Sequence, residues 1–272
     1  MKFSVIIPAR FASQRLPGKP LLDIGGKPMI WHTWQRAIES GAERLVIATD
    51  DPRIEQAAAG FGAEVVMTGE QHRSGTDRVA EAAAQMGLGD DAIIVNLQGD
   101  EPLMPPGLIR QAAETLFHQP DAQLATLATA VHSVGEFLDT NVVKLVIDET
   151  GRALYFSRAP IPWPRDGAGG DLLSQQSHGQ ALRHLGIYAY RGAALQTLAQ
   201  TPVTPMEEAE RLEQLRALWI DMRIQVAIAA EPMGPGVDSA EDLDRVRTLF
   251  STQRLEKRPK SVADKGSIFI DK

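Results

Sequence analysis

The chain of 272 residues contains no cysteine. This absence excludes disulfides, thiolate metal sites and a cysteine nucleophile, and it leaves the redox compartment undetermined. The sequence also lacks any apolar run of about 18 residues, the length that a membrane-spanning helix needs. Because the N-terminus passes directly into an apolar β-type segment without a signal-peptide pattern, we expect a cytoplasmic protein that does not bind membranes.

Motifs of several common enzyme classes are missing as well. Gly18-Lys19 lacks the upstream glycine spacing and the following Ser or Thr of a Walker A loop. No G-x-G-x-x-G follows the first apolar segment, which disfavours a dinucleotide dehydrogenase, and there is no serine nucleophile elbow. No His/His/carboxylate spacing indicates a transition metal. With a net charge of −7, the chain is not expected to bind nucleic acid.

The first twenty residues carry the clearest positive signal. Residues 2–9 form a short apolar run rich in β-branched residues, which is typical of a strand buried on both faces of a parallel sheet. The loop that follows places Arg10, Arg15 and Lys19 among two prolines and a glycine. Since ligands of open α/β sheets bind beyond the carboxyl ends of the strands, this loop predicts an anion site, most plausibly for phosphates. The alternative is a solvated basic loop.

Apolar runs alternate with helical patterns along the chain, which predicts an α/β fold with a mostly parallel sheet. Three polar loops, 9–20, 68–78 and 98–102, should leave the same edge of that sheet. We expect one domain over residues 1–254, with 124–190 as a smaller extension of the sheet, and a loosely ordered tail over 255–272. Strands are expected at 2–9, 44–49, 63–67, 91–97, 124–131, 142–148, 151–157, 182–190 and 223–230, and helices at 28–40, 52–60, after 78 to about 86, from 105, 204–218 and 239–253.

Two carboxylates on Gly/Pro-rich turns suggest a metal site. Asp100 follows a buried strand, and Asp238 lies on a tight turn late in the chain. Mg²⁺ takes one or two carboxylates and completes its shell with water and substrate phosphates. The alternatives are a helix cap or solvated turn for Asp100 and an ordinary helix start for Asp238. Carboxylates opposite phosphate-binding cations indicate phosphoryl or nucleotidyl transfer.

Eight segments spread along the chain form a pattern that is more specific than any one motif. They are Ile7-Pro8-Ala9-Arg10 with Ser13, Arg15 to Pro20, Ser74-Gly75-Thr76, Asn96 to Pro102, Tyr155 to Arg158, Arg183 to Tyr188, Leu212 to Arg216 and Gly236-Val237-Asp238. In this order they resemble the 3-deoxy-manno-octulosonate cytidylyltransferase (CMP-KDO synthetase) family. The resemblance runs from residue 1 to about 250 and leaves out 255–272. Asp77 stands where some members have glutamate, a change that keeps the charge.

The resemblance implies a Rossmann-like nucleotide-diphospho-sugar transferase fold. It implies that CTP and 3-deoxy-D-manno-octulosonate (KDO) give CMP-KDO and pyrophosphate, with Mg²⁺, in lipopolysaccharide biosynthesis. The implied catalytic residues are Arg15, Lys19, Asp100 and Asp238, the last two as metal ligands. The implied nucleotide-binding residues are Pro8, Ala9, Arg10, Arg15, Lys19, Ser74, Gly75, Thr76, Arg78, Gln98 and Gly99. The implied sugar-binding residues are Gln98, Arg158, His184, Tyr188, Glu210 and Gln214.

Each of these side chains also has a purely structural interpretation. His184 and Tyr188 face the same way on a strand, and the alternative for them is a core pair. Glu210 and Gln214 lie one helical turn apart, as on a solvated face, and Arg158 is consistent with a surface ion pair. The competing functions are a CMP-sialate synthetase or other sugar nucleotidyltransferase, and a non-catalytic nucleotide-binding module.

The resemblance also implies a homodimer, built on the segment 142–164. This segment is apolar and carries aromatic residues, yet it joins the long loop 158–181. A charged residue at Phe156 is expected to release monomers if Phe156 lies at the interface.

Overall fold

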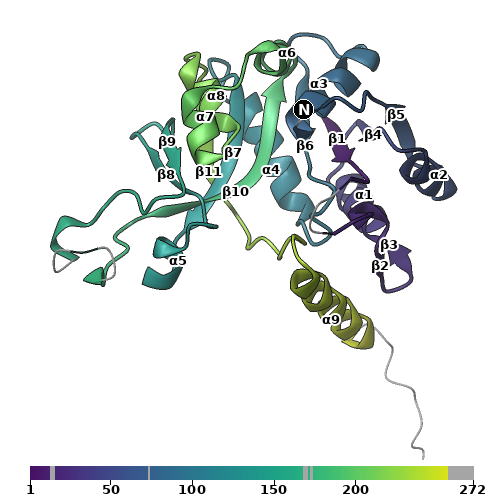
Figure 1. Ribbon diagram of the computed structural model, residues 1–272. Coiled ribbons are helices and arrows are strands. Elements are labelled where there is room, and N and C mark those ends of the chain that lie inside the picture. The colour runs from purple at the N-terminus through teal and green to yellow at the C-terminus, as the bar shows by residue number, and fades with distance from the viewer. Residues whose placement is uncertain (13–15, 73, 168–170, 172–173, 257–272) are drawn as a thin grey trace, which may run out of the picture.

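The computed structural model describes residues 1–12, 16–72, 74–167, 171 and 174–256. Within them, nine strands form one mixed sheet with the order β11-β7-β10-β6-β1-β4-β5, and β8 and β9 extend it from β10 (Figure 1). The strands are β1 Ser4–Ala9, β2 Asp23–Ile24, β3 Lys27–Pro28, β4 Arg44–Thr49, β5 Glu64–Met67, β6 Ile93–Asn96, β7 Leu124–Ala130, β8 Lys144–Ile147, β9 Ala153–Ser157, β10 Leu182–Arg191 and β11 Ile224–Ile228. The helices are α1 Met29–Glu39, α2 Pro52–Gly60, α3 Gly75–Gln85, α4 Pro106–Phe117, α5 Val134–Leu138, α6 Gly192–Gln200, α7 Pro205–Glu210, α8 Gln214–Trp219 and α9 Ala240–Glu256.

Strand β1 lies at the centre of the sheet, as its sequence predicts. It pairs in parallel with β4 on one side and β6 on the other, and all six of its residues are buried. Because side chains alternate along a strand, Val5 and Ile7 pack with α1 and α4 while Ile6 packs with α3 on the opposite face. The predicted α/β fold is therefore confirmed.

Strand β10 is the exception to the parallel arrangement. It runs antiparallel to both of its neighbours, β6 and β7, because the chain returns through it from the extension that β8 and β9 form. In Figure 1 this extension projects on the side away from α2. No helix among the described residues is long and apolar enough to cross a membrane.

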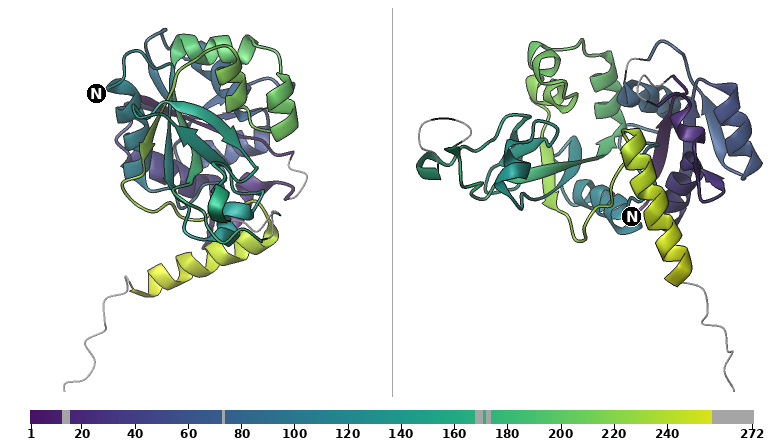
Figure 2. Two further views of the ribbon diagram at one scale, coloured as in Figure 1. Left: turned by 90° about the vertical axis from the view of Figure 1, so that its left-hand side faces the viewer. Right: turned by 60° about the horizontal axis from the view of Figure 1, so that its bottom comes forward.

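Helix α9 closes the described part of the chain. It lies beside the small β2–β3 sheet, where Val237, Leu243 and Val246 pack against Ile24 and Met29 (Figure 2). The helix ends at Glu256, so it includes the first two residues of the predicted tail. Residues 257–272 lie outside the described part.

Local structure departs from the predictions at two places that matter for the site. Helix α3 begins at Gly75 rather than after residue 78, because the Ser74 hydroxyl caps it by accepting from the Asp77 N–H at 3.1 Å. The helix predicted over 204–218 is two helices, α7 and α8, separated by Arg211 at φ 55°. The short elements α5, α6, β2 and β3 were not predicted.

Candidate active site

The loops beyond β1, β5 and β6 line one cleft of about 1020 Å³, together with residues of β10 and of α7–α8. This confirms that polar residues from the three predicted loops converge. We call the wall formed by residues 8–10, 74–78 and 98–99 the β1 side of the cleft. The wall formed by His184, Tyr188, Glu213 and Gln214 is called the β10 side.

The first loop folds back on itself to aim Lys19 into the cleft. Gly18 adopts φ 68° and donates its N–H to the Phe11 carbonyl at 3.1 Å. A side chain at Gly18 would lie 3.0 Å from the Phe11 ring, so both the backbone conformation and the space require glycine. The short turn η1, Lys19–Leu21, follows directly. Arg10 is exposed at the cleft wall, and Arg15 lies outside the described residues.

Lys19 lies between the two predicted carboxylates. Its Nζ is 2.5 Å from Asp100 Oδ2 and 3.2 Å from Asp238 Oδ1. The Val237 N–H donates to the Asp100 carbonyl at 3.0 Å, which fixes the late turn against the end of β6. The structure therefore brings together Lys19, Asp100 and Asp238, although 219 positions separate the first from the last.

Glu101 is a third carboxylate at this point, and the sequence analysis gave it no role. Burial raises its pKa well above the usual range, and the negative charges of Asp100 and Asp238 raise it further. Within the described chain, its Oε2 has no hydrogen-bond partner. The described residues contain no group of three His, Cys, Asp or Glu side chains arranged to hold a metal ion by themselves. Asp100 and Asp238 are the two carboxylates that contact the same positive group, the Lys19 ammonium.

On the β1 side, three segments approach each other closely. The cleft is lined on this side by Pro8, Ala9, Ser74, Gly75, Thr76, Gln98 and Gly99, which are residues that the resemblance implies for the nucleotide. A side chain at Gly99 would lie 3.0 Å from the Pro8 carbonyl oxygen, so the backbones of β1 and of the loop after β6 can meet only with glycine there.

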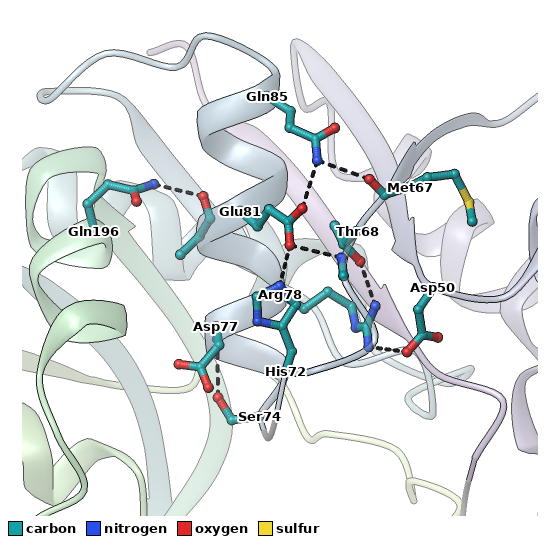
Figure 3. Close-up of polar contacts among 12 residues, drawn as sticks. Asp50, Met67, Thr68, His72, Ser74, Asp77, Arg78, Glu81, Gln85 and Gln196 are labelled. Atoms are coloured by element: carbon teal, nitrogen blue, oxygen red, sulfur yellow. Dashed lines mark hydrogen bonds and ion pairs between the residues drawn. The ribbon is translucent and has the colours of Figure 1, made fainter.

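Arg78 also borders the cleft, but protein groups hold its guanidinium. Nη2 pairs with Asp50 Oδ2 at 2.6 Å and Nη1 donates to Thr68 Oγ1 at 2.5 Å, so that α3 is tied to the ends of β4 and β5 (Figure 3). Nearby, Glu81 accepts from the Gly69 N–H and contacts the ring of His72, a cleft residue that the sequence analysis did not single out. These contacts fix the loop before α3.

On the β10 side, the structure brings His184, Tyr188 and Gln214 to the cleft with Gln98. His184 and Tyr188 have ring centroids 5.1 Å apart. Strand β10 is irregular between these residues, because His184 pairs with Ala128 and Tyr188 pairs with Thr126, so four residues of β10 span two residues of β7. Since both numbers are even, the two rings stay on the same face of the sheet. Burial lowers the pKa of His184 to about 3, so its imidazole is neutral at physiological pH.

Two buried polar atoms on this wall make no hydrogen bond of normal geometry in the described part of the protein, although Thr126 lies close to the first of them. They are the Tyr188 hydroxyl and the Gln214 Nε2, and both residues are more than nine-tenths buried. Buried polar groups are normally hydrogen-bonded, so such atoms at a cleft wall indicate that a ligand completes them.

Arg158 and Glu210 do not line the cleft. The Arg158 Nε donates to the Glu210 carbonyl at 2.8 Å, and the Glu210 carboxylate accepts from Ser157 Oγ at 2.5 Å. Glu213 takes the place beside Gln214 instead, because the break at Arg211 turns α8. The Thr76 hydroxyl donates to Glu213 Oε2 at 2.7 Å, which joins the two walls, and burial raises the pKa of Glu213. In the sequence, the only indication that Glu213 belongs to the site was its position inside the Leu212 to Arg216 segment of the family resemblance.

Comparison with known proteins shows which proteins this chain resembles. A family model described as cytidylyltransferase matches residues 4–224. The chain is 53% identical over 252 residues to the 3-deoxy-manno-octulosonate cytidylyltransferase of Halorhodospira halophila, covering 92% of this chain and 98% of that protein. It is 53% identical over 250 residues to the same-named protein of Thioalkalivibrio sulfidiphilus, covering 92% of this chain and 99% of the relative. A solved structure of CMP:2-keto-3-deoxy-manno-octonic acid synthetase complexed with CTP has a TM-score of 0.84 at 42% identity, covering 93% of this chain and 100% of the other.

Proposed function

The chain belongs to the 3-deoxy-manno-octulosonate cytidylyltransferase family, and from this premise we propose how its cleft performs the reaction. The enzyme transfers a cytidylyl group from CTP to KDO, giving CMP-KDO and pyrophosphate for lipopolysaccharide biosynthesis. The comparisons do not favour a sialate synthetase or a non-catalytic nucleotide-binding module. The observation that carries the proposal is the meeting of Lys19 with Asp100 and Asp238 between the two walls of one cleft.

The β1 side takes the nucleotide. The backbone of Pro8 and Ala9 and the polar segment from Ser74 to Thr76 surround the cytosine and ribose. Arg10 and Lys19 face the triphosphate, for which cations on a loop of fixed shape are suited. The resemblance adds Arg15 to this group, and Arg15 lies outside the described residues. Arg78 acts from behind this wall, since its guanidinium is already paired with Asp50.

The β10 side takes the sugar acid. The unpartnered Tyr188 hydroxyl and Gln214 amide can donate hydrogen bonds to hydroxyl or carboxylate oxygens of KDO. His184 is neutral there, so it contributes a hydrogen-bonding ring rather than a positive charge. Glu213 lies next to Gln214 and contacts Thr76, which puts it where the two substrates meet.

The reaction is a direct displacement. The anomeric hydroxyl oxygen of KDO gives up its proton to water and attacks the α-phosphorus of CTP, the bond from that phosphorus to the β-phosphate oxygen breaks, and pyrophosphate leaves with the electron pair of that bond. Lys19 stabilises the charge of the departing pyrophosphate. The sequence has no cysteine, and the cations and carboxylates of the cleft suit positioning and charge neutralisation rather than covalent catalysis.

Asp100 and Asp238 would hold Mg²⁺. The donor set fits, because two carboxylates from separate loops are held within contact of one positive group, and Mg²⁺ takes one or two carboxylates alongside substrate phosphates. When bound, the ion supplies neutralisation of negative charge on the phosphate oxygens.

We also propose that two copies associate through the extension of the sheet. Leu154 on β9 is 55% exposed and Trp163 in the following loop is 40% exposed, two large apolar side chains on an arm that projects from the fold. The prediction that Phe156 could lie at the interface is wrong, because its side chain is fully buried and packs on His184. The pairing of β8 with β9 shifts register between Tyr155 and Ala153, so Leu154 has no partner on β8 and faces outward, although it lies only two positions from the buried Phe156.

The experiment that tests the function measures pyrophosphate release with CTP and KDO, omitting each substrate and Mg²⁺ in turn. Release should require all three and should fall to background with sialic acid in place of KDO. Release with CTP alone, or equal release with sialic acid, would contradict the proposal. A phosphorothioate CTP that is chiral at the α-phosphorus should give product with inverted configuration, whereas retention would indicate a covalent enzyme intermediate.

A further inference from the structure

Glu210 is the last residue of α7. Its three oxygen atoms accept hydrogen bonds from residues at the end of β9. Its Oε1 accepts from Ser157 Oγ at 2.5 Å and its Oε2 accepts from the Arg158 N–H at 2.9 Å. Its carbonyl oxygen accepts from Arg158 Nε at 2.8 Å. Both carboxylate oxygens are therefore engaged by protein donors, and Glu210 is not among the residues that line the cleft.

The end of β9 that receives Glu210 is itself firmly held. Lys144 is fully buried, and its Nζ donates to the carbonyl oxygens of Arg158 at 2.7 Å, Val142 at 2.6 Å and Asp139 at 2.8 Å. The Arg158 Nη1 donates to the Thr140 carbonyl at 3.0 Å. A buried cation that satisfies three carbonyls makes this end of the β8–β9 hairpin a fixed support.

The residues directly after Glu210 form the β10 side of the cleft. Arg211 takes the left-handed conformation at φ 55°, which reverses the chain between α7 and α8. Leu212, Glu213 and Gln214 follow and line the cleft. Since the chain turns sharply one residue after Glu210, the point where Glu210 is anchored decides where Glu213 and Gln214 lie.

A separate ion pair joins helices α7 and α8 to each other. Arg216 of α8 pairs with Glu207 of α7, and this ion pair holds the two helices to each other. That pair does not reach the sheet extension. Among the described residues, the hydrogen bonds of Glu210 to Ser157 and Arg158 are the polar contacts that join this helix pair to β9.

We infer that Glu210 is a positioning residue, whose carboxylate docks the α7–α8 pair on the end of β9 and thereby sets Glu213 and Gln214 for the sugar acid. It does this without contacting the sugar. The inference rests on the proposed function, and it replaces the direct sugar contact that the family resemblance implied for Glu210. The alternative, direct contact, predicts different behaviour for Ser157, which is buried and lies outside the cleft wall.

The test compares Glu210→Gln with Ser157→Ala, with Glu208→Gln on the exposed side of the same helix as matched control. Each of the first two variants should raise the KM for KDO about five- to twentyfold and leave the KM for CTP within about twofold, because one docking contact is lost in each. The double variant should be no worse than the poorer single variant, since both changes break the same contact. Glu208→Gln should match the unaltered enzyme.

A second measurement needs no turnover. Hydrogen–deuterium exchange of ligand-free enzyme should be faster over residues 205–219 in Glu210→Gln than in Glu208→Gln, because undocking loosens the helix pair. A residue that only contacts sugar would leave exchange in the ligand-free enzyme unchanged, and that result would overturn the inference. An unchanged KM for KDO in Ser157→Ala would overturn it as well. Failure of the unaltered enzyme to release pyrophosphate would instead refute the proposed function, and the exchange experiment would still decide the docking.

Discussion

Replacing Arg216 with methionine tests how much the α7–α8 pair depends on one buried ion pair. Arg216 is 5% exposed and Glu207 is 6% exposed. The guanidinium donates through Nε to Glu207 Oε2 at 2.8 Å and through Nη2 to Oε1 at 2.5 Å. Its Nη1 reaches the carbonyl oxygens of Leu198 at 3.2 Å and Thr201 at 3.3 Å. Methionine fills most of the volume of the arginine stem but supplies none of these donors.

The size of the effect follows from the charge left behind. Removing one partner of a buried pair leaves an uncompensated buried charge and typically costs about 3–5 kcal/mol. A domain is stable by only about 5–15 kcal/mol, so Arg216→Met should lose a large part of its free energy of unfolding. Glu207 is then left buried without its positive partner, which is the origin of this cost.

Urea unfolding at pH 7, followed by far-ultraviolet circular dichroism, measures this cost. The control is Arg152→Met, because Arg152 is 40% exposed and pairs with Asp221, which is 95% exposed. Such surface pairs contribute about 0–1 kcal/mol. Adding Glu207→Gln to Arg216→Met should recover part of the loss, since the stranded charge is removed. A loss no larger than that of Arg152→Met, or a double variant no more stable than Arg216→Met, would refute the reasoning.

Four further predictions concern the cleft and the assembly. Asp100→Asn should abolish pyrophosphate release while circular dichroism stays unchanged, and unchanged turnover would remove Asp100 from the site. Lys19→Ala should lower kcat/KM for CTP at least tenfold, about 1.4 kcal/mol, whereas a change within twofold would mark Lys19 as an ordinary surface charge. In an NMR titration, His184 should stay neutral down to about pH 4, because burial lowers its pKa to about 3 from 6.5. Its contribution to stability is then complete above pH 6.5 and is lost as the pH falls toward 3, and a midpoint near 6.5 would contradict the burial argument. Leu154→Glu should release monomers in sedimentation at micromolar concentration without lowering the unfolding temperature, and an unchanged assembly would place the interface elsewhere.

Local sequence patterns indicated the architecture and the cations and carboxylates at the phosphate end of the site, whereas the other site residues came from the family resemblance. The apolar run of β1 predicted a strand that is buried on both faces. A central strand of the sheet is buried in this way, and β1 lies there. Strands that alternate with helices then placed the loops that follow β1, β5 and β6 at one edge, which is why Lys19 and Asp100 could be paired from sequence. Their pairing with Asp238 was predictable from residue type, because two carboxylates and cations on separate loops suit one phosphate chemistry.

The tertiary structure alone decided which of two nearby side chains reaches the cleft. Helical spacing put Glu210 and Gln214 on one face, but the left-handed Arg211 breaks that helix, so Glu213 lies beside Gln214 and Glu210 turns to β9. The Glu210 carboxylate is bound by donors from Ser157 and Arg158, more than 50 positions away. Periodicity reports only the contacts within a segment, and these distant hydrogen bonds exist only once the chain has folded.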